Sequence, residues 1–308
     1  MAVAGEQIAV LDQAARRRSK PWYLDVAVRL VREKPLGAFG AVIVLVLVLV
    51  AIFANVLATY PYERVHLADT LLPPGTAGID GPTYILGTDN LGRDVYSRIV
   101  YGARVSMTVA FGAVGLGLLF AVLLGTFSAF MGGAVDLVLQ RVVDAWISIP
   151  FFILLLTIMM IFEPGIGPVI FALALAGTFS NSRVVRSAVL STMTMPYIEA
   201  ARATGATNGR IILRHVLPNI MAPIIVVATL GLGNVILAES ALSFLGFGVP
   251  PPFPTWGQML SGSSLSFMYE APWLAVVPGV AISLAVFGFN MFGDALRDLL
   301  DPRLRGGR

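Results

Sequence analysis

Six long stretches of this chain contain no Asp, Glu, Lys or Arg, and this pattern restricts the possible folds more than any other feature. A helix needs about 20 predominantly apolar residues to cross a bilayer, and each stretch is close to that length or longer. Only 13% of the residues are charged, against about 25% in soluble domains. The sequence therefore predicts an all-α, polytopic membrane protein with six transmembrane helices. The stretches are residues 35–62, 105–135, 145–162, 164–182, 215–238 and 271–293.

The third and fourth stretches are separated by Glu163 alone, which is followed by Pro164 and Gly165. Proline and glycine break helices, so we expect a tight turn there and an antiparallel pair of spans. The first hydrophobic run, 36–58, is too long for the core of a signal peptide, and no A-x-A cleavage site follows it. It is expected to remain as an uncleaved anchor.

The distribution of the 21 Lys and Arg residues predicts the orientation of the spans. Six spans place both termini on one side of the membrane, and 17 of the basic residues fall on that side. The other four lie in the first loop on the opposite side, residues 59–104. Short cytoplasmic loops are rich in Lys and Arg, so both termini are expected in the cytoplasm. The net charge of +3 then reflects membrane orientation and not a nucleic-acid surface.

Two segments beside the spans carry patterns of their own. Trp22, Val26 and Leu30 recur every four residues before the first span, which predicts an amphipathic helix lying in the headgroup plane. The alternative is a soluble tail with a chance apolar stripe. Residues 243–272 are uncharged until Glu270 and contain four prolines between 250 and 254. They predict either a cap or re-entrant segment over a central path or an ordinary extracytoplasmic loop.

The fourth loop, residues 186–218, is expected in the cytoplasm and has the pattern helix, break, helix. Residues 199–204 are rich in helix formers, and Gly205 suits the left-handed turn at a helix end. Thr207 or Asn208 is suited to cap the second helix. On that second helix, four-residue spacing places Arg210 and Arg214 on one face.

The same spacing places Ile212 and Val216 together on another face of the second helix. The loop therefore predicts a compact, partly apolar helical hairpin.

The order of residues in this loop resembles the EAA loop of the membrane subunits of binding-protein-dependent ABC importers. Glu199-Ala200-Ala201 is followed by Gly205 after four residues and by Leu217-Pro218 after twelve more. The chain is most similar to the C-type subunit of the dipeptide, oligopeptide and nickel permease group, and the similarity runs from about residue 20 to 305. Further matching segments are Leu86 to Asp94, Ser97-Arg98, Gly102 to Arg104, Asp136 with Arg141 and Asp144, Ser148-Ile149-Pro150, Leu242 to Gly246, Trp256-Gly257, Gly293-Asp294 and Leu296 to Leu304.

The resemblance implies a type I ABC importer permease fold whose cytoplasmic loop inserts into a cleft of the ATPase subunit. It divides the chain into a cytoplasmic tail with the interfacial helix (1–35), the first transmembrane helix (36–58), an extracytoplasmic loop (59–104), a five-helix core (105–296) and a cytoplasmic tail (297–308). The core contains the coupling loop (186–218) and the extracytoplasmic cap (243–272). The residues that the resemblance assigns to ATPase coupling are Glu199, Ala200, Ala201, Gly205, Ile212, Leu217 and Pro218.

The resemblance also implies the partners and the location. These are a homologous B-type permease subunit, one or two ATP-binding subunits, an extracytoplasmic substrate-binding protein and the lipids of a bacterial or archaeal cytoplasmic membrane. ATP and Mg belong to the ATPase subunits, and no cofactor is expected on this chain. Di- and oligopeptides are the expected substrates, with a nickel complex, a sugar or another solute as alternatives, because no residue here distinguishes among them.

Three residues of the fifth span are candidates for the translocation path or its gate. Glu239 ends that span beside Ser240, and carboxylates near membrane depth usually face a cavity or a partner; Asn234 lies on the same helix. The alternative for Glu239 is a structural role in which it accepts hydrogen bonds from the proline-rich cap.

Other functional classes have little support in the sequence. The chain has no cysteine, and its two histidines, His66 and His215, are expected on opposite sides of the membrane, so neither a metal site nor a catalytic triad is predicted. The six uncharged stretches lack the carboxylates that an intramembrane enzyme would need. An ion-coupled carrier lacks them too, and no inverted repeat is found.

Overall fold

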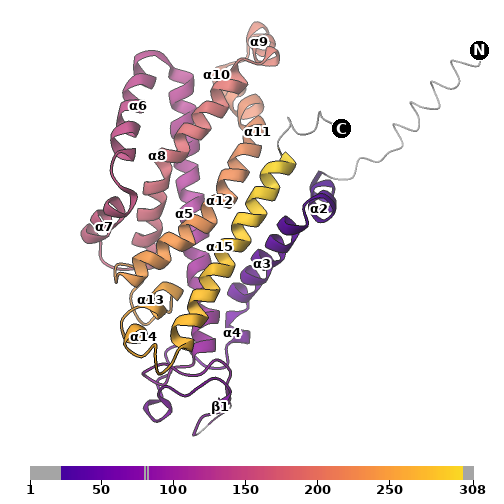
Figure 1. The fold of residues 1–308 in the computed structure, drawn as a ribbon. Helices are drawn as coiled ribbons and strands as arrows, with labels where there is room; N and C mark the ends of the chain where they lie inside the picture. The colour runs from indigo at the N-terminus through magenta and orange to yellow at the C-terminus, as the bar shows by residue number, and fades with distance from the viewer. Residues whose placement is uncertain (1–21, 80, 82, 301–308) are drawn as a thin grey trace, which may run out of the picture.

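The computed structural model describes residues 22–79, 81 and 83–300, and this part of the chain is almost entirely helical. Five of its helices are long and apolar enough to cross a membrane, and a bent pair of helices makes a sixth span if the pair is counted as one (Figure 1). The all-α fold is confirmed, with five to six spans. The five helices are α3 (Pro35–Ile52), α5 (Val95–Met131), α8 (Ile166–Met193), α12 (Met221–Phe244) and α15 (Trp273–Leu300); the bent pair is α6 (Gly133–Ile147) with α7 (Phe151–Ile161).

Small residues allow these helices to pack closely, as is usual in membranes. A Cβ atom on Gly117 of α5 would lie 2.9 Å from the backbone oxygen of Ala174 in α8. Gly40 of α3 approaches the backbone of Gly288 in α15 in the same way, at 2.8 Å. Helix α12 packs against α5, α8 and α15, and Figure 1 shows α3 alongside α15 at the edge of the bundle.

The helix α5 begins at Val95 and not at residue 105, so the extracytoplasmic loop predicted to end at residue 104 ends at Asp94. In the sequence, the charged residue Arg104 marks the start of the uncharged stretch. In the structure, its guanidinium has hydrogen-bonding partners. The guanidinium of Arg104 donates hydrogen bonds to the backbone oxygen of Ala51 at 2.8 Å and to Asn55. Such pairing lets an arginine lie beside the membrane-spanning part of a helix.

The third predicted span, 145–162, is in fact the bent pair. Helix α6 starts at Gly133 and meets α7 at an angle of 90° around Ser148–Pro150. Proline has no backbone N–H to continue the helical hydrogen bonds, and Pro150 precedes the first residue of α7. The predicted break around Glu163 is confirmed, because α7 ends at Ile161 and α8 begins after Gly165.

The N-terminal segment forms a helix, α2 (Trp22–Glu33), which runs into α3. Leu30 is buried against Ala295 and Leu299 near the end of α15. The ammonium of Lys34 also pairs with Asp298, at 2.5 Å. The helix is therefore fastened to the C-terminal span, while its placement in the headgroup plane stays a prediction. The remaining parts of the predicted cytoplasmic tails, residues 1–21 and 301–308, lie outside the described residues.

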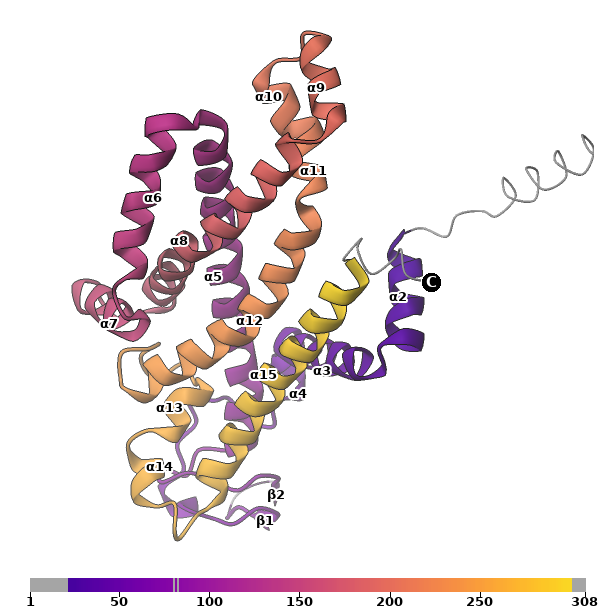
Figure 2. The same cartoon turned by 45° about the horizontal axis from the view of Figure 1, so that its top comes forward.

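The segments between α3 and α5 form a small folded unit at the far end of the bundle (Figure 2). It contains α4 (Ala54–Leu57), η1 (Leu67–Asp69) and a hairpin of β1 (Thr76–Ala77) and β2 (Thr83–Tyr84), in which Thr76 pairs with Tyr84. The buried carboxylate of Asp69 accepts hydrogen bonds from the Tyr84 hydroxyl at 2.9 Å and from the Ile79 amide at 3.1 Å. The short helices α13 (Trp256–Leu260) and α14 (Ser263–Ser266) lie at the same end.

Candidate functional site

A knob of short helical segments projects from one end of the bundle, between α8 and α12, at the opposite end from the β-hairpin (Figure 1). We call these ends the knob end and the hairpin end. Because α8 continues to Met193, the first residues of the predicted coupling loop 186–218 belong to a spanning helix. The knob consists of α9 (Pro196–Ala203), α10 (Asn208–Ile211), η2 (Ile212–Val216) and α11 (Leu217–Asn219).

The turn inside the knob has the conformation that the sequence indicates. Gly205 has a φ of 81°, a left-handed conformation that favours glycine, and its amide donates to the backbone oxygen of Arg202 at 2.9 Å. Thr207 caps α10, since its hydroxyl accepts a hydrogen bond from the Arg210 amide at 3.4 Å. Of the two predicted capping residues, Thr207 is the one that caps the helix.

The second helix of the knob differs from the prediction in its register. Residues 212–216 form a π-helical turn, which adds a residue to the helical repeat. Ile211 and Val216, five positions apart, are therefore the fully buried pair, while Ile212 is only half-buried. The four-residue spacing of a regular helix placed Ile212 and Val216 on one face, whereas in the π-helical turn the residue buried together with Val216 is Ile211.

The base of the knob is a compact apolar cluster that joins it to the spanning helices. Three side chains of the knob and one from the residue that follows it pack against the knob ends of α5 and α8, and each is at most 1% exposed. Because tightly packed interiors transmit displacement with little compression, this cluster links motion of the knob to motion of both helices. The four are Ile198, Ile211, Val216 and Ile220, and they contact Ala129, Val185 and Val189.

The predicted coupling residues lie on or near the free surface of the knob. Glu199, Ala200, Gly205 and Pro218 are exposed, whereas Ala201, Ile212 and Leu217 are half-buried. Within the described residues, no carboxylate or basic group forms an ion pair with Glu199, Arg202, Arg210 or Arg214.

Two apolar side chains on the same surface were not predicted as coupling residues. Leu213 is 69% exposed and Tyr197 is 43% exposed. Two large exposed apolar side chains on one projecting element make this surface a candidate for protein binding. The sequence shows both residues, but the regular helix expected there gave no reason to predict that the Leu213 side chain is exposed.

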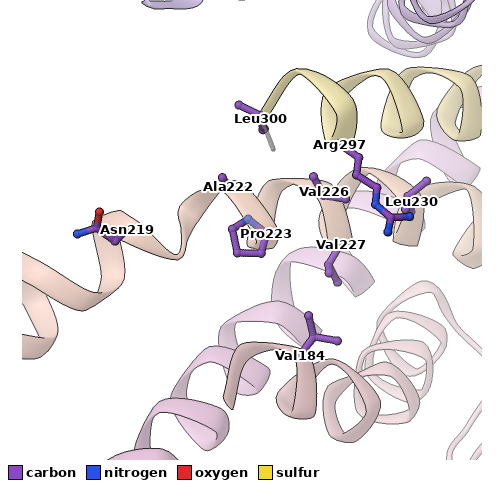
Figure 3. A pocket seen from close by; sticks show the side chains of 9 residues that line it. All are labelled: Val184, Asn219, Ala222, Pro223, Val226, Val227, Leu230, Arg297 and Leu300. Carbon is purple, nitrogen blue, oxygen red and sulfur yellow. The ribbon is translucent and has the colours of Figure 1, made fainter. Parts of the chain in front are cut away.

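A groove runs along α12 from the knob end toward the hairpin end. The cavity nearest the knob has a volume of about 510 Å³ and is lined by α8, α11, α12 and α15 (Figure 3). Figure 3 shows the guanidinium of Arg297 reaching from α15 over Val226 and Leu230 of α12. A middle cavity of about 420 Å³, lined by α5, α7, α8 and α12, adjoins it at Val227, which lines both.

The middle cavity is uncharged, and its only lining side chains with amide or hydroxyl groups are Ser180, Asn181 and Asn234. Asn234, one of the predicted path residues, is therefore a lining residue. Glu239 and Ser240 line neither cavity; they are buried and directly follow Ala238, the last residue of α12 that lines the groove. The middle cavity therefore offers neutral hydrogen-bonding groups among apolar walls.

The carboxylate of Glu239 is fully buried among hydroxyl groups from three segments. It accepts hydrogen bonds from Ser243 of α12 at 2.7 Å and from Ser106 of α5 at 3.3 Å. The Thr255 hydroxyl, immediately before α13 in the predicted cap, lies beside this carboxylate and is equally buried. Glu239 thus connects the hairpin ends of two spanning helices with the cap.

The predicted cap is folded back against the bundle. The indole N–H of Trp256, which is 1% exposed, donates to the backbone oxygen of Ile99 in α5 at 3.1 Å. A Cβ atom on Gly102 would lie 2.8 Å from the Trp256 ring, so α5 leaves space there for the indole. The segment covers the hairpin end of α12 and differs in this from an ordinary exposed loop.

Comparison with known proteins gives two family matches. Residues 117–306 match the family described as binding-protein-dependent transport system inner membrane component. Residues 22–74 match the N-terminal transmembrane domain of oligopeptide transport permease C. Together these matches include most of the described chain.

Relatives of known name are similar over nearly their whole length. The dipeptide transport system permease protein of Alkalihalophilus pseudofirmus is 40% identical over 285 residues, which cover 92% of this chain and 91% of the relative. The oligopeptide transport system permease protein of Bacillus subtilis is 34% identical, covering 94% and 92%. A solved structure of the inward-facing MetNI methionine ABC transporter has a similar fold, with a TM-score of 0.54 and 20% identity over 66% of this chain and 96% of that one.

Proposed function

This chain belongs to the family of binding-protein-dependent transport system inner membrane components, and on that premise we propose that it is a permease subunit of an ATP-driven peptide importer. The observation that carries the proposal is the knob, whose exposed surface is joined by a packed apolar base to helices that line a groove. The names of the relatives support di- and oligopeptides as the substrates.

The two ends of the bundle take different roles in this proposal. The knob faces the cytoplasm and docks on an ATP-binding subunit, as the excess of basic residues near it favours. The hairpin end faces the extracytoplasmic side and meets a substrate-binding protein. A homologous B-type subunit supplies the other half of the path, and the membrane is the bacterial or archaeal cytoplasmic membrane.

The chain contributes positioning and motion, and ATP and Mg are held by the partner subunits. Closure of the ATPases displaces the knob, and the cluster around Ile198 and Val216 passes the displacement to α5, α8 and α12. ATP can shift the equilibrium between two states only by making different contacts in each. Because the knob is rigid, those contacts can change the shape of the groove.

The neutral polar groups that line the middle cavity are consistent with a substrate that is recognised through its backbone amides. Peptide amides hydrogen-bond to Asn181, Asn234 and Ser180 whatever side chains the peptide carries. A cavity built in this way accepts peptides of different charge, and it has no ligand set for a metal complex among its lining residues.

Affinity purification of the tagged chain in mild detergent tests the proposal. We expect a second six-span subunit and one or two ATP-binding subunits to co-purify with it, and the complex to hydrolyse ATP. Recovery of a stable, active chain without these partners would contradict the proposed role and favour a self-contained carrier.

A further inference from the structure

The hydrogen bonds of Glu239 differ in what they hold together. The bond from Ser243 lies within α12, four residues along the same helix. The bond from Ser106 ties α12 to α5. Of the hydroxyl groups around the carboxylate, only that of Thr255 belongs to the cap. Because the Thr255 hydroxyl also accepts the Gln258 amide at 3.1 Å, its proton is left for the carboxylate.

The backbone of the cap lies directly on α12 at the same place. A Cβ atom on Gly257 would overlap the backbone oxygen of Ser240, and one on Gly248 would overlap the side chain of Ser243. Any side chain at these glycines would push the cap away from the helix. The contact is therefore close, with the buried Glu239 carboxylate beneath it, and the Trp256 indole holds the same segment to Ile99 of α5.

The groove along α12 stops at this contact. Ala238 is the last α12 residue that lines the middle cavity, and the next residue is Glu239. The groove extends from there to the knob-end cavity, whose lining includes Arg297 and Leu300 at the end of α15. The middle cavity thus ends next to the part of α12 that the cap covers, while the groove continues toward the knob.

We propose that Glu239 is a positioning residue that keeps the outer end of the translocation path closed, by fastening the Thr255 to Gly257 segment onto α12 and α5. The inference rests on the proposed function and adds to it a closing element on the substrate-entry side. Outward opening requires the Thr255 to Gly257 segment to leave the surface around Glu239.

The test uses the complete complex of both permease subunits and the ATPases in proteoliposomes, with its binding protein and a labelled dipeptide. The readout is ATP hydrolysis without the binding protein, a basal rate that is low while the outer end stays closed. For Glu239→Ala we expect this rate to rise roughly tenfold, the effect of losing one hydrogen bond to a charged group. Damage to the fold would lower the basal rate of ATP hydrolysis. An increase in this rate therefore distinguishes a role in holding the cap closed from a merely structural role.

Three further variants make the test specific. Glu239→Gln keeps the size and part of the hydrogen bonding, and it is expected to fall between Glu239→Ala and the wild type. Gly257→Ala pushes the cap away without altering the carboxylate, and it should also raise the basal rate. Thr229→Ala removes a hydroxyl that bonds within α12, to Ile225, and makes no bond to the cap, so its basal rate should equal that of the wild type.

Two results would count against different claims. If the wild-type complex hydrolyses ATP but the binding protein does not stimulate it, the proposed importer function is contradicted. If the wild type is stimulated and the assembled Glu239→Ala complex keeps the low basal rate, the fastening role of Glu239 alone is overturned.

Discussion

Arg186 of α8 and Asp136 of α6 form a two-pronged ion pair, with guanidinium nitrogens 2.7 and 2.5 Å from the two carboxylate oxygens. The Ser128 hydroxyl of α5 donates to the same carboxylate. The pair therefore joins three helices close to the base of the knob. Both side chains are half-buried, at 28% and 18% exposure, so solvent only partly screens the attraction between them.

Loss of this pair is expected to destabilise the bundle. Asp136→Asn removes the charge that Arg186 pairs with, at a cost of roughly 1–3 kcal/mol. The thermal midpoint of the purified protein should fall by several degrees. Arg141→Gln is the matched control, because Arg141 is 76% exposed and its pair with Asp144 contributes little. Equal midpoints for the two variants would contradict this role of the pair.

A charge at the tip of the knob is expected to prevent docking of the ATPase. Leu213→Asp places a carboxylate where the proposed interface buries an apolar side chain, which weakens such contacts by about 2 kcal/mol or more. Co-purification of the ATP-binding subunit should drop at least about tenfold, with the fold unaltered. Ile79→Asp provides the control, since Ile79 is equally exposed (70%) but lies at the hairpin end. Undiminished co-purification with Leu213→Asp would place the interface elsewhere.

The apolar base of the knob is expected to determine how efficiently hydrolysis drives transport. Ile198→Ala leaves a cavity in a fully buried cluster, at a cost of about 2–5 kcal/mol. The knob should then lose amide protection over residues 196–219, and the complex should hydrolyse more ATP per peptide transported. The hydrogen-exchange rates and the transport ratio are the measurements. An unchanged ratio together with a loosened knob would show that rigidity of the base is dispensable.

The hairpin unit is expected to loosen in alkali. Burial, followed by the hydrogen bond to Asp69, raises the pKa of Tyr84 from 10.0 to about 12. A raised pKa means that the folded unit binds the phenolic proton more tightly, so this stabilisation is complete below pH 10.0 and declines as the pH rises toward about 12. Limited proteolysis of the loop against pH measures it. Tyr84→Phe should remove this part of the pH dependence, and an identical profile would argue against the assignment.

Much of the architecture could be predicted because the membrane imposes a simple rule on spanning helices. Five uncharged stretches correspond to helices, and the break at Glu163 and the turn at Gly205 lie where expected. The predictions failed where a charge is paired or a helix is irregular. Arg104 and Asp136 interrupt the uncharged stretches, yet their partners are residues far away in the sequence.

The functional residues show the same difference between those whose partners are near in the sequence and those whose partners are far away. Gly205 and Thr207 act through neighbouring backbone, so their roles follow from local sequence. Glu239 acts through Ser106 and Thr255, which belong to other segments, and the sequence left its role open. The outward position of Leu213 depends on a π-helical turn that no spacing rule anticipates.

Peptide uptake by the reconstituted transporter tests the central claim most directly. Proteoliposomes would contain this chain, its partner permease subunit and the ATP-binding subunits, with ATP on the ATPase side and the binding protein with a labelled dipeptide on the other. We predict uptake that requires ATP and the binding protein together and that Leu213→Asp abolishes. Uptake that persists without ATP or in that variant, or transport of a sugar or a nickel complex in place of peptide, would contradict the account.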